Sequence, residues 1–187
     1  MKLICRISLL GLVATISCKA LQTEPAVREE IVVAPEDYSG FKVEERIVRG
    51  DSLAGLINNG STVKIVFDYY KKNEVARGDV VAYAFAGNKD PIIKIVRGIP
   101  GDKFGIVNDG VKWRLTINGE IAKNSKGEPY SLDDHARRVL SLYVTDYKGV
   151  IPRNTYLILG NLVEGTIDST RFGLVDRADI LGKVVYK

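Results

Sequence analysis

The stretch PIIKIVRGIPGD, residues 91–102, combines β-branched residues with a lysine and ends in turn-forming residues. Apart from Lys94, residues 92–96 are isoleucine or valine, which predicts a β-strand followed by a turn. Alternate side chains of a strand share a face, so Ile92, Lys94 and Val96 lie together. Apolar neighbours remove water from a lysine, which lowers its pKa and makes it a candidate general base. A lysine whose amine reaches water from an edge strand would give the same pattern.

Short β-like runs, separated by turn residues, continue on both sides of this stretch. We expect strands at residues 41–48, 62–67, 79–85, 92–97, 104–108, 113–117, 156–159 and 181–186. Asn118-Gly119 favours a hairpin turn because both residues tolerate positive φ. Short helices are expected at residues 51–58 and 133–142. The chain is therefore predicted to be mainly β, with a small inserted β subdomain at about residues 104–150.

Residues 1–21 are predicted to be a hydrophobic leader or membrane anchor. Two basic residues precede an apolar run, Ile7 to Cys18, which has the length of a signal-peptide core and falls short of the ~20 residues of a comfortable membrane span. The leader could be cleaved after Ala20, carry a lipid on Cys18, or remain as a short anchor. Each of these places the remaining chain outside the cytoplasm. A buried core helix is the other interpretation of this run.

Charge divides the chain into three parts. Residues 1–21 carry +3, residues 22–47 carry −4 and residues 48–187 carry +5, within a formal net charge of +4. We interpret residues 22–47 as an acidic spacer that leads into the first strand, and residues 48–187 as the main domain. The positive charge is spread out, with no basic run interleaved with aromatic residues, so no nucleic-acid partner is expected.

Cysteine and histidine are too few for several common kinds of site. Cys5 and Cys18 both lie in the leader, and His135 is the one histidine. A disulfide framework, a thiol nucleophile and a zinc site are therefore not expected, and neither is another metal or cofactor. A Ser-His-Asp scheme would have to use His135, which lies in a charged stretch typical of a solvated surface.

A second stretch, Gly50-Asp51-Ser52-Leu53, brings a hydroxyl to a turn. The glycine permits a sharp turn that exposes Ser52, whose own N–H could stabilise an oxyanion. By itself Gly50-Asp51-Ser52 is more often an ordinary turn or a helix N-cap than a nucleophile.

A third stretch, Thr166-Ile167-Asp168-Ser169, places two hydroxyls and a carboxylate within four positions. Such a loop could orient a nearby ammonium and hydroxyl through hydrogen bonds. An ordinary polar loop, with Asp168 paired to Arg171, is the alternative.

In this order the clusters resemble the conserved boxes of bacterial type I signal peptidases, from about Val43 to Val185. The matching segments are Gly50–Leu53 for the nucleophile box, Arg77–Val81 for the Arg-Gly-Asp strand, Ile93–Asp102 for the lysine box, Trp113–Gly119 for the hairpin, and Tyr156–Asn161 with Asp168-Ser169 for the last box. The lysine box and the Asn-Gly hairpin are the most specific of these.

The resemblance implies a signal-peptidase-like β-sheet or barrel core and a serine endopeptidase with Ser52 as nucleophile and Lys94 as general base. Oxyanion or supporting roles fall to Gly50, Asp51, Thr166, Asp168 and Ser169. No cofactor or metal is implied. The implied substrates are preproteins with small residues before the cleavage site. They would be cut at the cytoplasmic membrane, on its extracytoplasmic (periplasmic) side.

Several positions depart from the family's pattern. They are Leu53 for Met, Gly55 for Pro, Ile95 for Arg, Asn161 for Asp, Thr166 for Ser, and Thr170 within the Asp-Ser-Arg triplet. Three alternatives therefore stay open: a dedicated pilin or conjugation-protein processing peptidase, an inactive exported homologue acting as a binding protein, and a self-cleaving repressor of the LexA type. The repressor would need an N-terminal DNA-binding domain where this chain has a hydrophobic leader.

Overall fold

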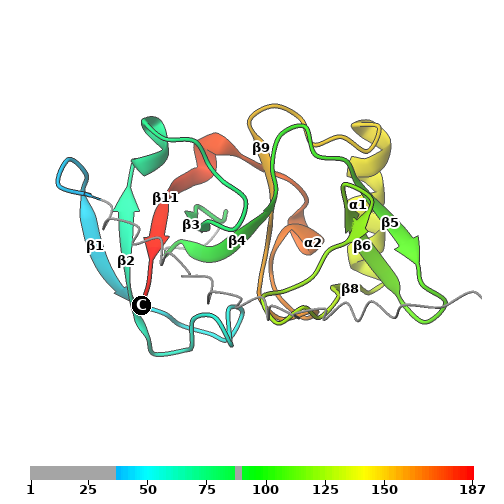
Figure 1. Cartoon of the computed structure of the whole chain (residues 1–187), viewed down its shortest axis with the longest axis horizontal. Helices are drawn as coiled ribbons and strands as arrows, with labels where there is room; N and C mark the ends of the chain where they lie inside the picture. The colour runs from blue at the N-terminus through cyan, green and yellow to red at the C-terminus, as the bar shows by residue number, and fades with distance from the viewer. Residues whose placement is uncertain (1–36, 87–89) are drawn as a thin grey trace, which may run out of the picture. The chain divides into compact units, whose positions relative to one another are not determined.

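The computed structural model describes residues 37–86 and 90–187 (Figure 1). The leader and most of the acidic spacer predicted from the sequence lie outside these residues. Within the described ranges, no helix is long and apolar enough to cross a membrane.

The larger of two antiparallel sheets has seven strands in the order β1-β2-β11-β3-β4-β9-β10. Their bounds are β1 Val43–Ile47, β2 Thr62–Phe67, β3 Val80–Tyr83, β4 Ile92–Gly98, β9 Thr155–Leu159, β10 Val175–Asp176 and β11 Ile180–Val185. The central strands β3 and β4 pair in register, with Lys94 opposite Val81. This register places Lys94 inside the large sheet, beside β3 and next to the point where the pairing of β4 with β9 begins.

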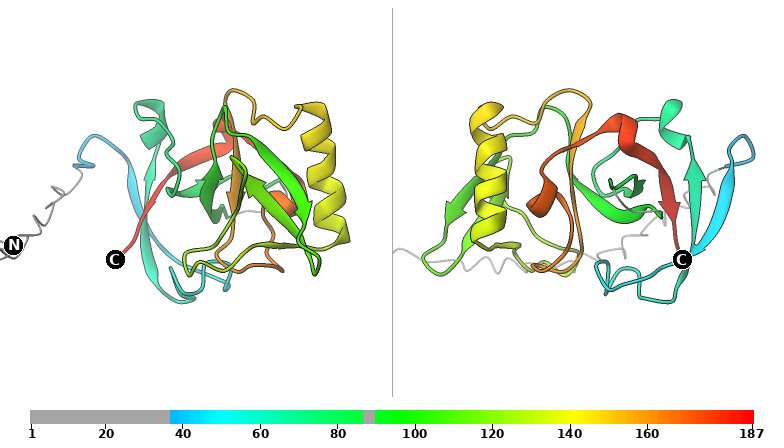
Figure 2. Two further views of the ribbon diagram at one scale, coloured as in Figure 1. Left: turned by 45° about the vertical axis from the view of Figure 1, so that its right-hand side comes forward. Right: turned by 180° about the vertical axis from the view of Figure 1, so that it is seen from behind.

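The smaller sheet is formed by the chain between β4 and β9. It contains β5 Phe104–Asn108, β6 Trp113–Ile117, β7 Glu120–Ile121 and β8 Ser131–Leu132, and it is followed by helix α1, Asp134–Asp146. Figure 2 shows α1 beside β5 and β6 at the end of the molecule away from β1. The remaining elements are one-turn helices: η1 Tyr69–Lys71, α2 Ser169–Phe172 and η2 Arg177–Asp179.

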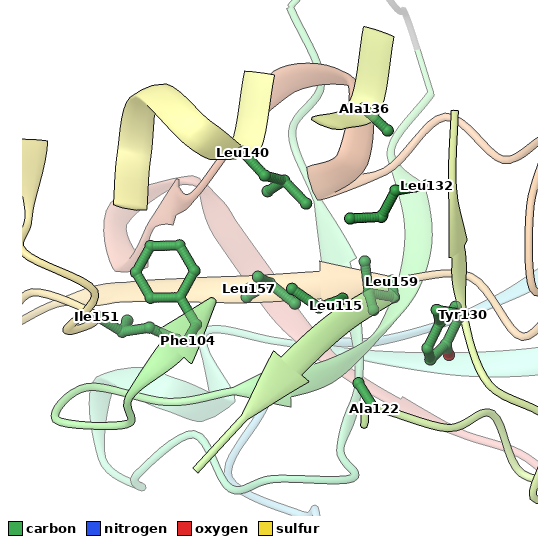
Figure 3. Packing of buried hydrophobic residues seen from close by; sticks show 10 residues of the cluster. All are labelled: Phe104, Leu115, Ala122, Tyr130, Leu132, Ala136, Leu140, Ile151, Leu157 and Leu159. Atoms are coloured by element: carbon green, nitrogen blue, oxygen red, sulfur yellow. The ribbon is translucent and has the colours of Figure 1, made fainter. Parts of the chain in front are cut away.

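A shared core joins the smaller sheet and α1 to the larger sheet. Phe104, Leu115 and Leu140 are buried together with Leu157 and Leu159 of β9 (Figure 3). Burying side chains of this size stabilises a fold by about 1.5–3 kcal/mol each. The contacts with β9 therefore fix the small sheet to the strand that also leads into the last cluster predicted from the sequence.

The prediction of a mainly β fold is confirmed. Each of the eight predicted strands is present within two residues of its predicted bounds, and the second predicted helix is α1. Asp133 caps that helix, because its carboxylate accepts a hydrogen bond of 2.8 Å from Ala136 N. The two-residue strands β7, β8 and β10 and the helix α2 were not predicted.

The predicted helix at residues 51–58 is wrong, since this segment forms a series of turns. Gly55 adopts φ +84°, in the left-handed region that interrupts a right-handed helix. Ala54 N bonds to Asp51 O and Ile57 N to Leu53 O, which completes isolated turns without a continuous ladder. The apolar spacing of Leu53 and Ile57 arises because both side chains are buried in the core of the large sheet.

Candidate active site

The turn that carries Ser52 begins at Gly50, whose φ of +92° favours glycine. Gly50 N donates to the side chain of Asn59 at 3.3 Å, and buried Leu53 anchors the turn in the core. Ser52 is half-buried, whereas Asp51 is exposed and contributes its carbonyl to the turn. The predicted glycine turn is therefore present, but Ser52 is half-buried in it and not exposed.

Lys94 is buried to 4% exposure on β4. Its Nζ lies 2.9 Å from Ser52 Oγ and donates to Ile93 O at 2.8 Å. Burial lowers the pKa of Lys94 from 10.5 to about 8, although the charge of Asp168 acts in the opposite direction. The ammonium is thus poorly solvated and sits against a hydroxyl, which is the arrangement that a lysine base requires.

The carboxylate of Asp168 organises the third cluster. It is 2% exposed and accepts hydrogen bonds from Gly160 N at 2.9 Å and from the Thr166 hydroxyl. Its other oxygen accepts from the backbone and hydroxyl of Thr170 at 2.9 and 2.7 Å. The structure thus brings Thr166 to Asp168, and the hydroxyl of Thr166 donates to this carboxylate.

Ser169 is fully buried, and its Oγ accepts a hydrogen bond of 2.9 Å from Ile158 N. Its contact is with the backbone of β9. The alternative pairing of Asp168 with Arg171 is wrong, because Arg171 pairs with Asp133, at 2.5 Å. The partner of Arg171 comes from the cap of α1, far away in the sequence.

Gly160, directly after β9, brings the nucleophile turn and the third cluster together. A Cβ at this position would lie 2.7 Å from Ser52 O and 2.7 Å from the Thr166 side chain, closer than packed atoms allow. Asn161 N donates to Ser52 O at 2.6 Å. The absence of a side chain at Gly160 therefore permits β9 to pass directly against both segments.

A groove of about 410 Å³ contains Ser52 and Lys94. Its walls are formed by residues 45–49 at the end of β1 and by residues 90–94 at the start of β4, with Val63 and Ile65 between them. The lining combines apolar residues with Ser52, Lys94 and exposed charged residues, which are Glu45, Arg46, Arg49 and Asp90. A larger hollow of about 490 Å³, next to Asp68 and Arg177, contains neither Ser52 nor Lys94.

Among residues 37–86 and 90–187, no three His, Cys, Asp or Glu side chains cluster in a way that could hold a metal ion. His135 is exposed on α1.

A second polar cluster was not predicted from the sequence as a unit. Asp102 accepts two bonds from Arg77 Nη2, at 2.6 and 2.7 Å, one from Ile99 N at 2.8 Å and one from Asn118 Nδ2 at 2.8 Å. Burial alone would raise the pKa of Asp102, but these donors together lower it below its ordinary value. The Arg-Gly-Asp segment, the turn after β4 and the Asn-Gly hairpin are therefore joined through one carboxylate.

Residues 31–187 match the model of the family described as signal peptidase, peptidase S26. Signal peptidase IB of Staphylococcus aureus is 31% identical over 159 residues, which cover 79% of this chain and 78% of that protein. Signal peptidase I of Bacillus caldolyticus is 26% identical over 150 residues, which cover 79% of this chain and 80% of that protein. A crystal structure of a signal peptidase I from Enterococcus faecalis V583 has 23% identity and a TM-score of 0.40, covering 62% of this chain and 98% of that chain.

Proposed function

We propose that the chain, which belongs to the signal peptidase family (peptidase S26), removes signal peptides from exported preproteins as a serine endopeptidase with Ser52 as nucleophile and Lys94 as general base. The observation that carries the proposal is the distance of 2.9 Å between Lys94 Nζ and Ser52 Oγ at the floor of the groove. Serine and lysine form a known variant of the serine–histidine–aspartate arrangement. The order of the boxes along the chain and the burial of Lys94 support the same assignment.

Acylation begins with neutral Lys94. Its Nζ takes the proton from Ser52 Oγ, which attacks the scissile carbonyl carbon and forms a tetrahedral intermediate. The resulting ammonium then gives that proton to the leaving nitrogen as the C–N bond breaks. A pKa of about 8 suits both steps, since the lysine can take up and release a proton near neutral pH.

Stabilisation of the oxyanion is assigned to the backbone N–H of Ser52. Within the described residues no hydrogen bond engages this N–H, so it can donate to a substrate oxygen. Gly50 has no side chain to add a second donor. Deacylation follows when Lys94 takes a proton from water and the hydroxide so formed attacks the ester carbon. As the bond between that carbon and Ser52 Oγ breaks, the Lys94 ammonium returns the proton to Oγ and the serine hydroxyl is restored.

The substrate is proposed to lie extended in the groove, between the end of β1 and the start of β4. Extended peptides bind in this way by adding main-chain hydrogen bonds along a strand, while alternate side chains enter shallow pockets. Ile47, Ile92 and Ile93 give the groove apolar walls. The family to which the chain belongs supports small residues, such as alanine, before the cleavage site, and these apolar walls suit such side chains.

The proposed location of this activity is the extracytoplasmic side of the cytoplasmic membrane. Residues 1–21 would serve as leader or anchor and residues 22–47 as a spacer before the peptidase domain. The basic residues before the apolar run favour a cytoplasmic N-terminus. A reporter fused after Lys187 that is active only in the cytoplasm would contradict this topology.

The proposal is tested by incubating the protein with a preprotein that carries an Ala-x-Ala cleavage site. Wild type is expected to release the mature protein, whereas Ser52→Ala and Lys94→Met are expected to leave it intact. Mass spectrometry of the product locates the cut. A well-folded wild type that cleaves no preprotein would favour an inactive homologue, and cleavage of one pilin-type substrate alone would favour a dedicated processing peptidase.

A further inference from the structure

Asn161, directly after Gly160, lies between the nucleophile turn and the small sheet. It is 1% exposed, and both its backbone and its side chain make hydrogen bonds. Its backbone N donates to Ser52 O at 2.6 Å, and its carbonyl accepts from Asn124 Nδ2 at 2.9 Å. The residue thus bonds to the turn with one backbone group and to the segment before β8 with the other.

The side chain of Asn161 also bonds to both the nucleophile turn and the segment before β8. Asn161 Nδ2 donates to Ala54 O at 2.9 Å, and Asn161 Oδ1 accepts from Ser125 N at 3.0 Å. Both partners are backbone groups of fixed polarity, so only one orientation of the amide satisfies them. The side chain therefore needs a donor on one side and an acceptor on the other, a requirement that an asparagine meets and an ionised aspartate does not.

We infer that Asn161 is a positioning residue, whose amide holds the Ser52 turn against β9 in the geometry required for the proposed reaction. Asn161 bonds to two carbonyl oxygens of the nucleophile turn: that of Ser52 itself and that of Ala54, two residues later. A turn that is fixed at two carbonyls keeps the Ser52 hydroxyl and N–H in a constant relation to Lys94. This inference rests on the proposed function, because it assigns Asn161 a role in the same reaction.

The family's usual residue is expected to impair this chain. Asn161→Asp keeps the size of the side chain and its acceptor for Ser125 N. The oxygen that replaces Nδ2, however, would face Ala54 O with a negative charge. A buried acceptor that loses its donor is costly, and a charge opposite it adds repulsion. Asn161→Asp should therefore release the nucleophile turn selectively, while Asn161→Ala removes both side-chain bonds without adding charge.

The experiment compares wild type, Asn161→Asp, Asn161→Ala and a matched control, Asn73→Asp. The side chain of Asn73 also donates to a backbone carbonyl, Tyr69 O at 2.9 Å, but outside the groove. We expect kcat for an Ala-x-Ala peptide to fall by about 10- to 100-fold in Asn161→Asp, at least as far as in Asn161→Ala, with little change in KM. Asn73→Asp should keep the wild-type kcat. Activities are divided by the folded fraction, which is measured by circular dichroism.

A second readout does not depend on cleavage. Hydrogen exchange of the peptide covering residues 51–57 should become faster in Asn161→Asp than in wild type, whereas Asn73→Asp should leave it unchanged. A wild-type kcat in Asn161→Asp, an equal loss in Asn73→Asp, or unchanged exchange of this peptide would each overturn the inference. If wild type cleaves nothing, the proposed function fails, and with it the catalytic part of this role, while the exchange rates still decide whether Asn161 holds the turn.

Discussion

Two polar clusters lie at the two ends of strand β4, and they differ in how completely their buried charge is paired. At its beginning, Lys94 is 4% exposed and contacts a hydroxyl and a carbonyl, while the nearby carboxylate of Asp168 is occupied by its own donors. After its end, Asp102 is 7% exposed and is bonded by Arg77, Ile99 N and Asn118. The partners of Lys94 compensate its charge only in part, whereas those of Asp102 compensate its charge fully. The first arrangement supplies a proton acceptor, and the second ties three segments together.

The pKa values express this difference. Burial lowers the pKa of Lys94 to about 8, so the neutral amine becomes available near physiological pH. Burial would raise the pKa of Asp102, but its donors reverse that effect and keep the carboxylate charged. Incomplete pairing therefore marks the group that is suited to chemistry, and complete pairing marks the group that is suited to structure.

The largest effect is expected from variants at the first cluster. Ser52→Ala and Lys94→Arg should each lower cleavage by about 10⁴-fold or more, since the proposed nucleophile and base would act as one unit and a guanidinium cannot be deprotonated at usable pH. Cleavage of a preprotein is measured by gel or mass spectrometry. Lys123→Arg, at an exposed lysine, is the control and should behave like wild type. Undiminished cleavage by folded Ser52→Ala would disprove the assignment of the nucleophile.

The burial of Lys94 should also cost stability. In the unfolded chain this lysine holds its proton up to about pH 10.5, but in the folded chain it does so only up to about pH 8. Between these values folding releases a proton, so the stability of wild type rises with pH. Lys94→Met should raise the free energy of unfolding by up to about 3 kcal/mol at pH 7, and the gain should disappear above about pH 10.5. Urea unfolding of wild type and Lys94→Met at several pH values measures this difference in the free energy of unfolding. A difference that is independent of pH would contradict the burial penalty.

The second cluster should show the reverse pattern. Asp102→Asn removes the charge that pairs with Arg77 and should lower the free energy of unfolding by about 2 kcal/mol at pH 7. The folded pKa of Asp102 lies below its unfolded value, so this stabilisation is present above about pH 3.8 and is lost as the pH falls through the folded pKa. The gap between wild type and variant should accordingly narrow in acid. Cleavage at a temperature where both proteins are folded should stay within a few-fold of wild type. A large fall in kcat without a loss of stability would mean that the two clusters are not separate.

The sequence pattern predicted the contact between Lys94 and Ser52 correctly, but it did not predict the segments packed around them. The alternation of Ile92, Lys94 and Val96 is sufficient to place a lysine among apolar neighbours, and the order of the boxes suggested its pairing with Ser52. The bonds of Asn161 were not predicted, because they join segments 37 and 107 residues away in sequence. The turn at Gly55 was misjudged as a helix, since the spacing of buried side chains does not reveal a positive φ.

The same limit applies to charge pairs. Arg171 lies three residues after Asp168, which suggested their pairing as the alternative interpretation of this segment. Folding places Arg171 next to Asp133 at the start of α1 and surrounds Asp168 with hydroxyl and backbone donors. Asp168 is the N-cap of α2 and Arg171 lies within that helix, so their spacing permits a contact. Which pair forms nevertheless depends on the packing of distant elements, here the cap of α1.

A smaller effect should follow from the wall of the groove. Ile92 is half-buried and lines the groove together with Lys94. Ile92→Thr introduces a hydroxyl and admits water, which favours the ammonium and should raise the pKa of Lys94 by less than about one unit. The pH profile of cleavage should shift by the same amount towards alkaline pH. Val185→Thr, on β11 and outside the groove lining, is the control. A shift of the profile to lower pH in Ile92→Thr would contradict desolvation as the cause.

The most direct test is the pH dependence of acylation in wild type. Single-turnover cleavage of an Ala-x-Ala peptide is followed from pH 6 to 11, with Lys94→Arg measured in parallel. If Lys94 is the buried base, the rate rises with pH through a single ionisation near pH 8 and then levels off, and Lys94→Arg is inactive throughout. A rate that rises only near pH 10.5, the ordinary value for lysine, or appreciable activity in Lys94→Arg, would contradict the account.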